Sequence, residues 1–291
     1  GAQRVIANDY TVEVRYLGSR GYHLPFQLQI NRPSGITKDR SLPTFLQRPS
    51  QASLDGLSLT LADLPLGAAA SPFTAAGFTS SITSFEPRGN SSYHGLATQV
   101  TKRFSHGLQF IGAHTWSHNI DDSTAALNST VLTPRRPQDF GDLRPERSSS
   151  ALDRRHRLSL SWVYEIPWQK TSTNWYLKNL AGNWSFSGTY IAETGAWGTA
   201  RSAVDSNRNG DNAGDRTIVN PGGDMKVGSG VTALTNSRGQ TVGYLANNPA
   251  AGYIVAGAGV YPTAGRNTIR LPGVNNFDLG LAKRINLAET K

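Results

Sequence analysis

One stretch in the second half of the chain has side chains that could bind a metal ion. In "DSNRNGDNAGD", oxygen-bearing side chains stand at alternate positions: Asp205, Asn207, Asn209 and Asp211. This spacing, with Gly210 at the bend, is typical of calcium loops. The twelfth position is Arg216, where an EF-hand loop has a glutamate that binds through both oxygens. Two interpretations therefore remain, a calcium site or a turn rich in Asn, Asp and Gly, and the missing glutamate favours the turn.

Two other polar clusters carry weaker chemical signals. His114 and His118 have a spacing that suits a metal site on a helix, but on a strand they lie about 13 Å apart, too far to share one ion. The segment 135–157 contains seven arginines among four acids. It could bind lipopolysaccharide phosphates or an anionic substrate, because arginine binds phosphate through two hydrogen bonds. Salt bridges within the segment are the interpretation we slightly favour.

No catalytic motif is recognisable. The G-x-S-x-G, H-E-x-x-H and phosphate-loop patterns are missing from the sequence. We therefore predict that the protein is not an enzyme, with no catalytic residues and no cofactor besides the calcium considered above. The net charge of +9 is not accompanied by an element that could recognise nucleic acid, so nucleic acid is not expected as a partner.

Six segments alternate apolar and polar residues, which is typical of strands with one apolar face. They cover residues 10–18, 91–104, 108–118, 155–168, 184–194 and 275–287. The segment "RHRLSLSWVYEIPW" shows the pattern most fully, and aromatic residues gather in its last third. Two further segments, "YHLPFQLQI" and "LSLTLADL", also alternate and could add two strands. The sequence therefore predicts an all-β, antiparallel fold.

The apolar face of these strands could meet either a protein core or lipid. We predict that it faces lipid, because the strands are about ten residues long, as a tilted strand must be to cross a bilayer, and aromatics lie near their ends. The residues expected to face lipid are Leu96, Val100, Phe104, Phe110, Trp116, Leu158, Leu160, Trp162, Tyr164, Trp184, Phe186, Tyr190, Phe277, Leu279 and Leu281.

The lengths of the connections support the same interpretation. Short or moderate links at 105–107 and 169–182 alternate with long polar ones at about 19–90, 120–154 and 197–272. Bacterial outer-membrane barrels have short periplasmic turns and long extracellular loops. The alternative is a secreted or surface β-sandwich that binds glycans or protein partners, whose strands also alternate.

Two residues on the apolar face test the lipid interpretation. Lys102 lies near a strand end, where a long side chain can reach the interface and a cation costs only about 0–1 kcal/mol. His114 lies in the middle of its strand, and the sequence offers no explanation for it.

The composition of the chain and the lengths of its apolar runs agree with a membrane barrel. The chain of 291 residues contains no cysteine, so disulfides and thiolate metal sites are excluded. No apolar run approaches the roughly 20 residues of a membrane-spanning helix, which leaves strands as the means of crossing. We treat residues 1–291 as one β-barrel region.

Several phrases resemble, in the same order, the C-terminal part of the Oar-like TonB-dependent outer-membrane receptors. They are "YTVEVRYLGSRGYHL", "SSYHGLATQVTKRFSHGLQFIGAHTWSHNIDD", "RRHRLSLSWVYEIPW", "DSNRNGDNAGDR" and "GRNTIRLPGVNNFDLGLAKRI". The intervals 31–90 and 217–264 show no such resemblance.

The resemblance implies a large barrel, a plug that gates it and a segment that engages TonB in the periplasm. The expected role is passage of a substrate across the bacterial outer membrane, with outer-membrane lipid and the TonB complex as partners. This sequence shows no plug and ends at "INLAETK", without the terminal aromatic strand usual in such barrels. We therefore expect it to form a partial barrel wall whose plug and last strand lie outside the sequence.

Overall fold

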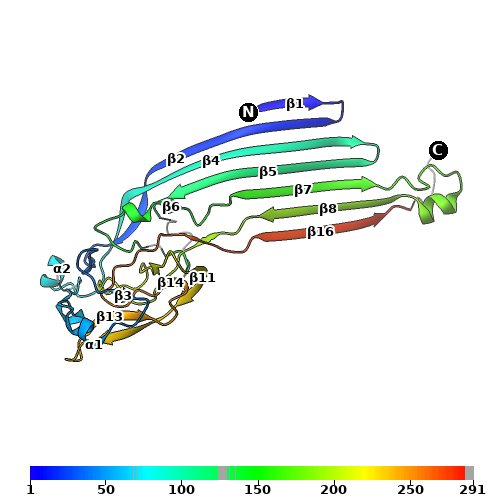
Figure 1. The fold of residues 1–291 in the computed structure, drawn as a ribbon. Coiled ribbons are helices and arrows are strands. Elements are labelled where there is room, and N and C mark those ends of the chain that lie inside the picture. Colours follow the sequence, from blue (N-terminus) through cyan, green and yellow to red (C-terminus); the bar gives the residue numbers. More distant parts are fainter. Residues whose placement is uncertain (68, 70, 124–129, 131, 135, 286–291) are drawn as a thin grey trace.

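The computed structural model describes residues 1–67, 69, 71–123, 130, 132–134 and 136–285. Its main feature is one long antiparallel sheet, which we call the wall (Figure 1). The strands run in the order β1-β2-β4-β5-β7-β8-β16, and the short β6 pairs with β5. Their bounds are Ala2–Ile6 (β1), Tyr10–Gln29 (β2), Thr83–Ser105 (β4), Leu108–Asp121 (β5), Ser148–Ser149 (β6), His156–Glu165 (β7), Trp184–Glu193 (β8) and Val274–Lys283 (β16).

All six expected strands are present in the wall, as β2, β4, β5, β7, β8 and β16. Strand β1 was not expected. Of the two doubtful segments, "YHLPFQLQI" continues β2, whereas "LSLTLADL" is not a strand and contains a 3₁₀ turn, η1 (Leu61–Asp63). The physical reason is a capping box, in which the Asp63 carboxylate accepts a hydrogen bond from the Thr60 backbone N–H at 2.9 Å.

The connections are sorted by length, as expected. The β4–β5 turn consists of His106 and Gly107, both with positive φ (51° and 77°), as a tight type I′ hairpin requires. The link between β7 and β8 lies at the same end and contains a π-helical turn, η3 (Leu177–Ala181). The three long connections, residues 30–82, 122–155 and 194–273, lie at the other end (Figure 1).

These three long connections pack together into what we call the loop domain. It contains two three-stranded sheets, β12-β13-β3 and β10-β14-β11, and a two-stranded sheet, β15-β9. Its elements are β3 (Thr44–Phe45), α1 (Gln51–Asp55), α2 (Pro72–Ala75), η2 (Arg144–Glu146), β9 (Trp197–Gly198), β10 (Ile218–Val219), β11 (Asp224–Ser229), β12 (Val231–Thr235), β13 (Thr241–Ala246), β14 (Ala251–Ile254) and β15 (Ile269–Arg270), together with η1. None of the described helices has the length and apolarity needed to cross a bilayer.

Among the described residues, nearly all buried apolar side chains lie in the loop domain. One cluster joins Ile36, Leu42 and Leu64 of the first long connection to Tyr244 and Val260 of the third. A second joins Leu54 to Leu234 and Val242. Among the described residues, the only buried hydrophobic side chains outside these connections are Phe26 and Leu28, at the loop end of β2. The loop domain therefore has its own cores, and the wall has none.

We predict that Leu54→Ala loosens the loop domain by about 2–5 kcal/mol, because a side chain only 2% exposed leaves a cavity when it is truncated. Leu66→Ala is the matched control, since Leu66 is 54% exposed and its loss should cost less than about 0.5 kcal/mol. Hydrogen exchange of the loop-domain amides measures both. Equal protection in the two variants would contradict the assignment of this core.

Candidate functional site

The strand register places the residues expected to face lipid on one face of the wall. Residues directly opposite each other in antiparallel strands point to the same side. Leu96 is opposite Trp116, and Phe110 is opposite Trp162. All of the expected residues except Phe104 are joined in this way from β4 to β16. Phe104 lies in the register irregularity between Lys102 and Ser105. We call this side the apolar face.

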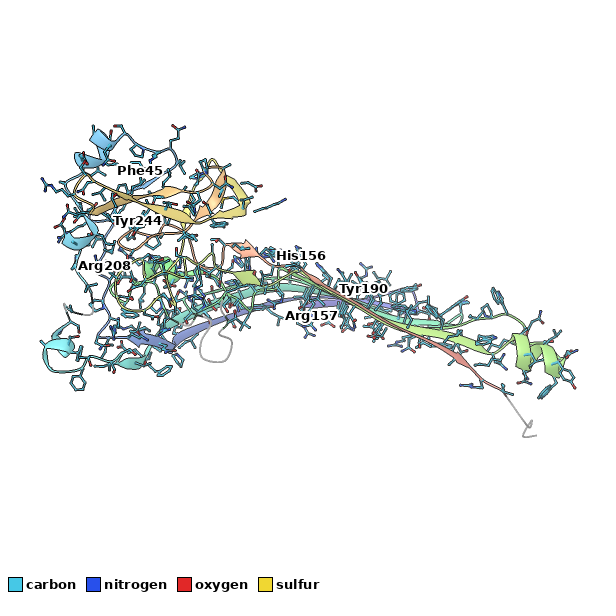
Figure 2. The ribbon with its side chains drawn as sticks, turned by 90° about the horizontal axis from the view of Figure 1, so that it is seen from below. Phe45, His156, Arg157, Tyr190, Arg208 and Tyr244 are labelled. Atoms are coloured by element: carbon cyan, nitrogen blue, oxygen red, sulfur yellow. The ribbon has the colours of Figure 1, made fainter. Side chains whose placement is uncertain are left out.

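The apolar face is exposed. Tyr16, Phe277 and Leu281 are between 63% and 64% accessible, although the rings of Tyr190 and Phe277 stack with centroids 4.1 Å apart. The opposite face is polar, with Thr11, Glu13, Arg15, Gln99, Thr101, Ser159, Ser161, Ser185, Ser187, Thr189, Asn276 and Asp278 along the strands. His156 and Arg157, neighbours in β7, lie on opposite sides of the wall (Figure 2). A sandwich would cover the apolar face with a second sheet, and the described residues provide none.

The lysines on the apolar face lie at its turn end and are fully engaged there. Lys102 Nζ donates hydrogen bonds to the carbonyl oxygens of Ser105 (3.0 Å) and Leu108 (3.2 Å), and it lies 5.4 Å from the centre of the Tyr10 ring. Lys283 Nζ bonds to the Leu180 carbonyl oxygen at 3.2 Å. These contacts at the strand ends agree with the expectation that Lys102 reaches the interface.

His114 has a partner that the sequence did not reveal. Its ring stacks on that of His156 in the next strand, with centroids 5.5 Å apart and Nε2 of His114 3.2 Å from Nδ1 of His156. His118 instead lies 3.1 Å from the Ser149 hydroxyl through its own Nε2. In the described part of the chain, no three His, Cys, Asp or Glu side chains form a group that could hold a metal.

The arginine-rich segment 135–157 is braced by salt bridges. Each of its arginines that the structure describes lies within 4 Å of a carboxylate: Arg136 with Asp211, Arg144 with Asp142, Arg147 with Asp122, Arg154 and Arg157 with Glu193, and Arg155 with Asp153. Arg135 lies outside the described residues. Only the pairs of Arg144 and Arg155 lie within the segment, and the other four arginines pair with acids elsewhere in the chain, so the segment is braced by salt bridges that are mostly not internal to it.

The residues of the possible calcium site form a series of consecutive Asx turns. The Asp205 carboxylate accepts hydrogen bonds from the backbone N–H groups of Asn209 (2.9 Å) and Gly210 (2.8 Å). Asn207 and Asn209 each accept one from the residue two positions on, and Asp211 also pairs with Arg136 at 3.1 Å. Calcium binding stays a prediction, while the turn geometry accounts for the composition.

Asp215, which follows these turns, is completely buried. One oxygen of its carboxylate accepts a hydrogen bond from the Ser206 N–H at 2.8 Å, and the other has no partner among the described residues. Burial, with a smaller contribution from the charges of Asp205 and Asp211, raises the pKa of Asp215 to about 8.

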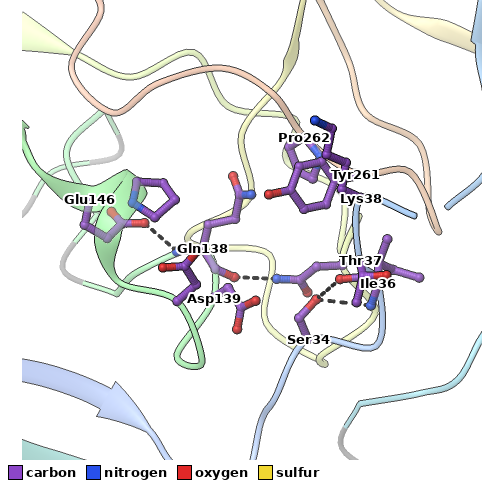
Figure 3. Close-up of a pocket in the computed structure, with 12 residues that line it drawn as sticks. Ser34, Ile36, Thr37, Lys38, Gln138, Asp139, Glu146, Tyr261 and Pro262 are labelled. Carbon is purple, nitrogen blue, oxygen red and sulfur yellow. Dashed lines mark hydrogen bonds between the residues drawn. The ribbon is translucent and has the colours of Figure 1, made fainter. Parts of the chain in front are cut away.

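The long connections also enclose a pocket of about 160 Å³ (Figure 3). It is lined by Ser34, Ile36, Thr37, Lys38, Gln138, Asp139, Asp142, Pro145, Glu146, Asn207, Tyr261 and Pro262. Asn207 Nδ2 donates to the Gln138 carbonyl oxygen at 2.6 Å, and the Gln138 N–H donates to Glu146 at 3.2 Å. Burial raises the pKa of Asp139. A polar pocket with one aromatic ring suits a small polar ligand group.

Two buried ion pairs fix the second and third connections around this pocket. Arg216 pairs with Glu146, and Arg266 pairs with Asp121 at the loop end of β5. Burial lowers the pKa of Arg216, although the negative charge of Glu146 partly opposes this shift. Arg266 also bonds to the Glu146 carbonyl oxygen at 2.6 Å. Sequence reasoning missed these residues, because no local pattern marks pairs whose members lie 70 or more positions apart.

An antiparallel sheet with one exposed apolar face, short turns at one end and long loops at the other is the wall of a membrane β-barrel. The described sheet is open, with β1 and β16 at its edges. The chain matches the family model described as outer membrane beta barrel domain over residues 1–291, and it belongs to this family. The predicted fold class and the bacterial outer-membrane location are thereby confirmed. No curated protein and no solved structure matched the chain.

The apolar face leads to a prediction about charge at its centre. Leu160→Lys should destabilise the inserted wall by about 2–4 kcal/mol, because a cation there would be desolvated near the bilayer midplane. Ser161→Lys, one residue along on the polar face, should cost little. Urea unfolding in lipid vesicles, followed by tryptophan fluorescence, measures both. A larger loss for Ser161→Lys would reverse the assignment of the two faces.

Asp215 leads to a prediction about pH. Its ordinary pKa in an unfolded chain is about 3.9, so below that value the carboxyl is neutral in both states and its burial costs least. Between this value and about pH 8, Asp215 is ionised in the unfolded chain but still protonated in the folded one. Its contribution should therefore destabilise the loop domain progressively as the pH rises. Asp215→Asn should lose this dependence. Protease resistance of the loops between pH 4 and 8, in metal-free buffer, is the measurement, and identical profiles for both proteins would contradict it.

Proposed function

We propose that this chain forms part of the barrel wall of a TonB-dependent, Oar-like transporter that admits a substrate across the outer membrane. The observation that carries the proposal is the packing of three long connections into one domain with a pocket, at one end of a lipid-exposed wall. Loops that only linked strands would not need hydrophobic cores or buried ion pairs. Substrate capture does need such rigidity, because binding groups must be held in place.

The proposal gives each part of the chain a role. The apolar face meets outer-membrane lipid, and the polar face meets the lumen or the plug. The loop domain captures the substrate through the pocket, where Gln138 and Tyr261 offer an amide and an aromatic ring. The TonB complex acts through the plug that such receptors carry. The chain has no catalytic role in this scheme, and no nucleic acid takes part.

Uptake measurements test this function. Cells that produce the wild-type protein would be offered a panel of labelled peptides, oligosaccharides and metal chelates, with and without a working TonB complex. We expect at least one compound to enter only when both the protein and TonB are present. If every compound enters independently of TonB, the transporter proposal is wrong.

The pocket is tested in the same cells. Tyr261→Ala should reduce uptake of that compound about tenfold, the effect of losing roughly 1.4 kcal/mol of binding. Tyr176→Ala is the control, since Tyr176 is 67% exposed and lies in the short link between β7 and β8, at the far end of the wall. Equal uptake by the two variants would show that the pocket does not bind the substrate.

A further inference from the structure

A second, larger groove lies on the apolar face where the wall meets the loop domain. It has a volume of about 530 Å³ and is lined mostly by apolar surface. Its floor is formed by His114, His156, Leu158 and Ala192, which the register places side by side on the apolar face. Its rim is formed by the segment 193–195 and by Arg270, Leu271 and Gly273. The groove is thus continuous with the face that meets lipid, at its extracellular end.

The rim carries a cation, Arg270; the charge of Asp153 acts on it, but that carboxylate already pairs with Arg155 at 3.5 Å. The Arg270 guanidinium lies 4.0 Å from the centre of the Trp197 ring, and it donates a hydrogen bond to the Gly195 carbonyl oxygen at 3.3 Å. It forms no ion pair with a described carboxylate, unlike the arginines of the segment 135–157. Glu193 is the one acid that lines the groove, and it is already engaged by Arg154 at 3.4 Å. A positive charge at the rim is therefore available.

The paired histidines add a hydrogen-bond donor to the floor. In a neutral pair, one ring N–H is used between His114 and His156. Whichever ring donates it, the other nitrogens of the pair present one further N–H and one acceptor. Two imidazoles on a lipid-exposed face are costly unless a polar group meets them, since buried polar groups need partners. The groove thus combines apolar lining residues, a guanidinium and a ring N–H.

We propose that this groove binds the phosphorylated, acylated glycolipid of the outer leaflet, with a phosphate on Arg270 and the histidine pair and an acyl chain along Leu158 and Ala192. Charge complementarity supports this occupant, because arginine binds phosphate through charge-assisted hydrogen bonds. Position supports it too, because the groove lies on the apolar face at the loop end, which is extracellular in this family. The inference rests on family membership and holds whether or not the chain transports a substrate.

The test uses the protein isolated from outer membranes in detergent. Native mass spectrometry would measure the binding of four probes: bisphosphorylated lipid A, dephosphorylated lipid A, phosphatidylglycerol and inorganic phosphate. We expect bisphosphorylated lipid A to bind most tightly. Arg270→Gln should weaken it by about tenfold or more, the loss of a charge-assisted hydrogen bond. His156→Leu should also weaken it, because one ring of the pair is removed.

Arg157→Gln is the matched control, since it removes the same charge from the opposite face of β7. Heat-modifiable gel migration would verify that each variant is folded. Arg270→Gln lies outside the wall strands and keeps the test valid if His156→Leu does not fold. The proposal is overturned if Arg270→Gln binds lipid A as Arg157→Gln does, or if dephosphorylated lipid A or phosphatidylglycerol binds equally well. Displacement of lipid A by inorganic phosphate alone would identify a simple anion site and would also overturn it.

Discussion

The pairing of backbone N–H and C=O groups between neighbouring strands is the constraint on which this structure depends. In a bilayer an unpaired backbone group costs several kcal/mol, so the strands must stay paired where they cross it, and the register irregularities of β4 lie towards its two ends. The register then decides which side chains meet lipid, because a slip by one residue would exchange the two faces. In β7 such a slip would move Ser159 and Ser161 to the apolar side and Leu160 to the polar side. The register therefore creates the apolar face, and it also places side by side the residues that form the floor of the groove beside Arg270.

The same constraint explains what could be predicted from the sequence. Lipid on one side imposes a period of two, so six strands and their apolar residues could be recognised without any knowledge of contacts. Gaps in the apolar pattern also have a local cause. Gly188 leaves room for the Trp162 ring of the neighbouring strand, which a Cβ at that position would meet at 2.5 Å. Such packing across strands preserves the face even where one strand has no side chain.

The loop domain could not be predicted, because its structure depends on contacts between distant segments. Leu57–Leu64 alternates like a strand, yet the Thr60 and Asp63 cap turns it into a 3₁₀ segment, and Leu61 and Leu64 pack against the core around Tyr244. His114 is understood only through His156, 42 positions away, and Asp121 only through Arg266. A periodic pattern reports the environment of one strand and carries no information about such partners.

The two ends of the apolar face differ in how they use their cations. At the turn end, Lys102 and Lys283 donate hydrogen bonds to backbone carbonyls and form cation–π contacts with the rings of Tyr10 and Trp184. These contacts anchor the wall at a fixed depth. At the loop end, Arg270 stacks on Trp197 and keeps most of its donors free of described partners. The lysines of the wall are thus satisfied at the turn end, whereas Arg270 of the loop domain is available at the loop end, as the proposed binding of a phosphorylated glycolipid there requires.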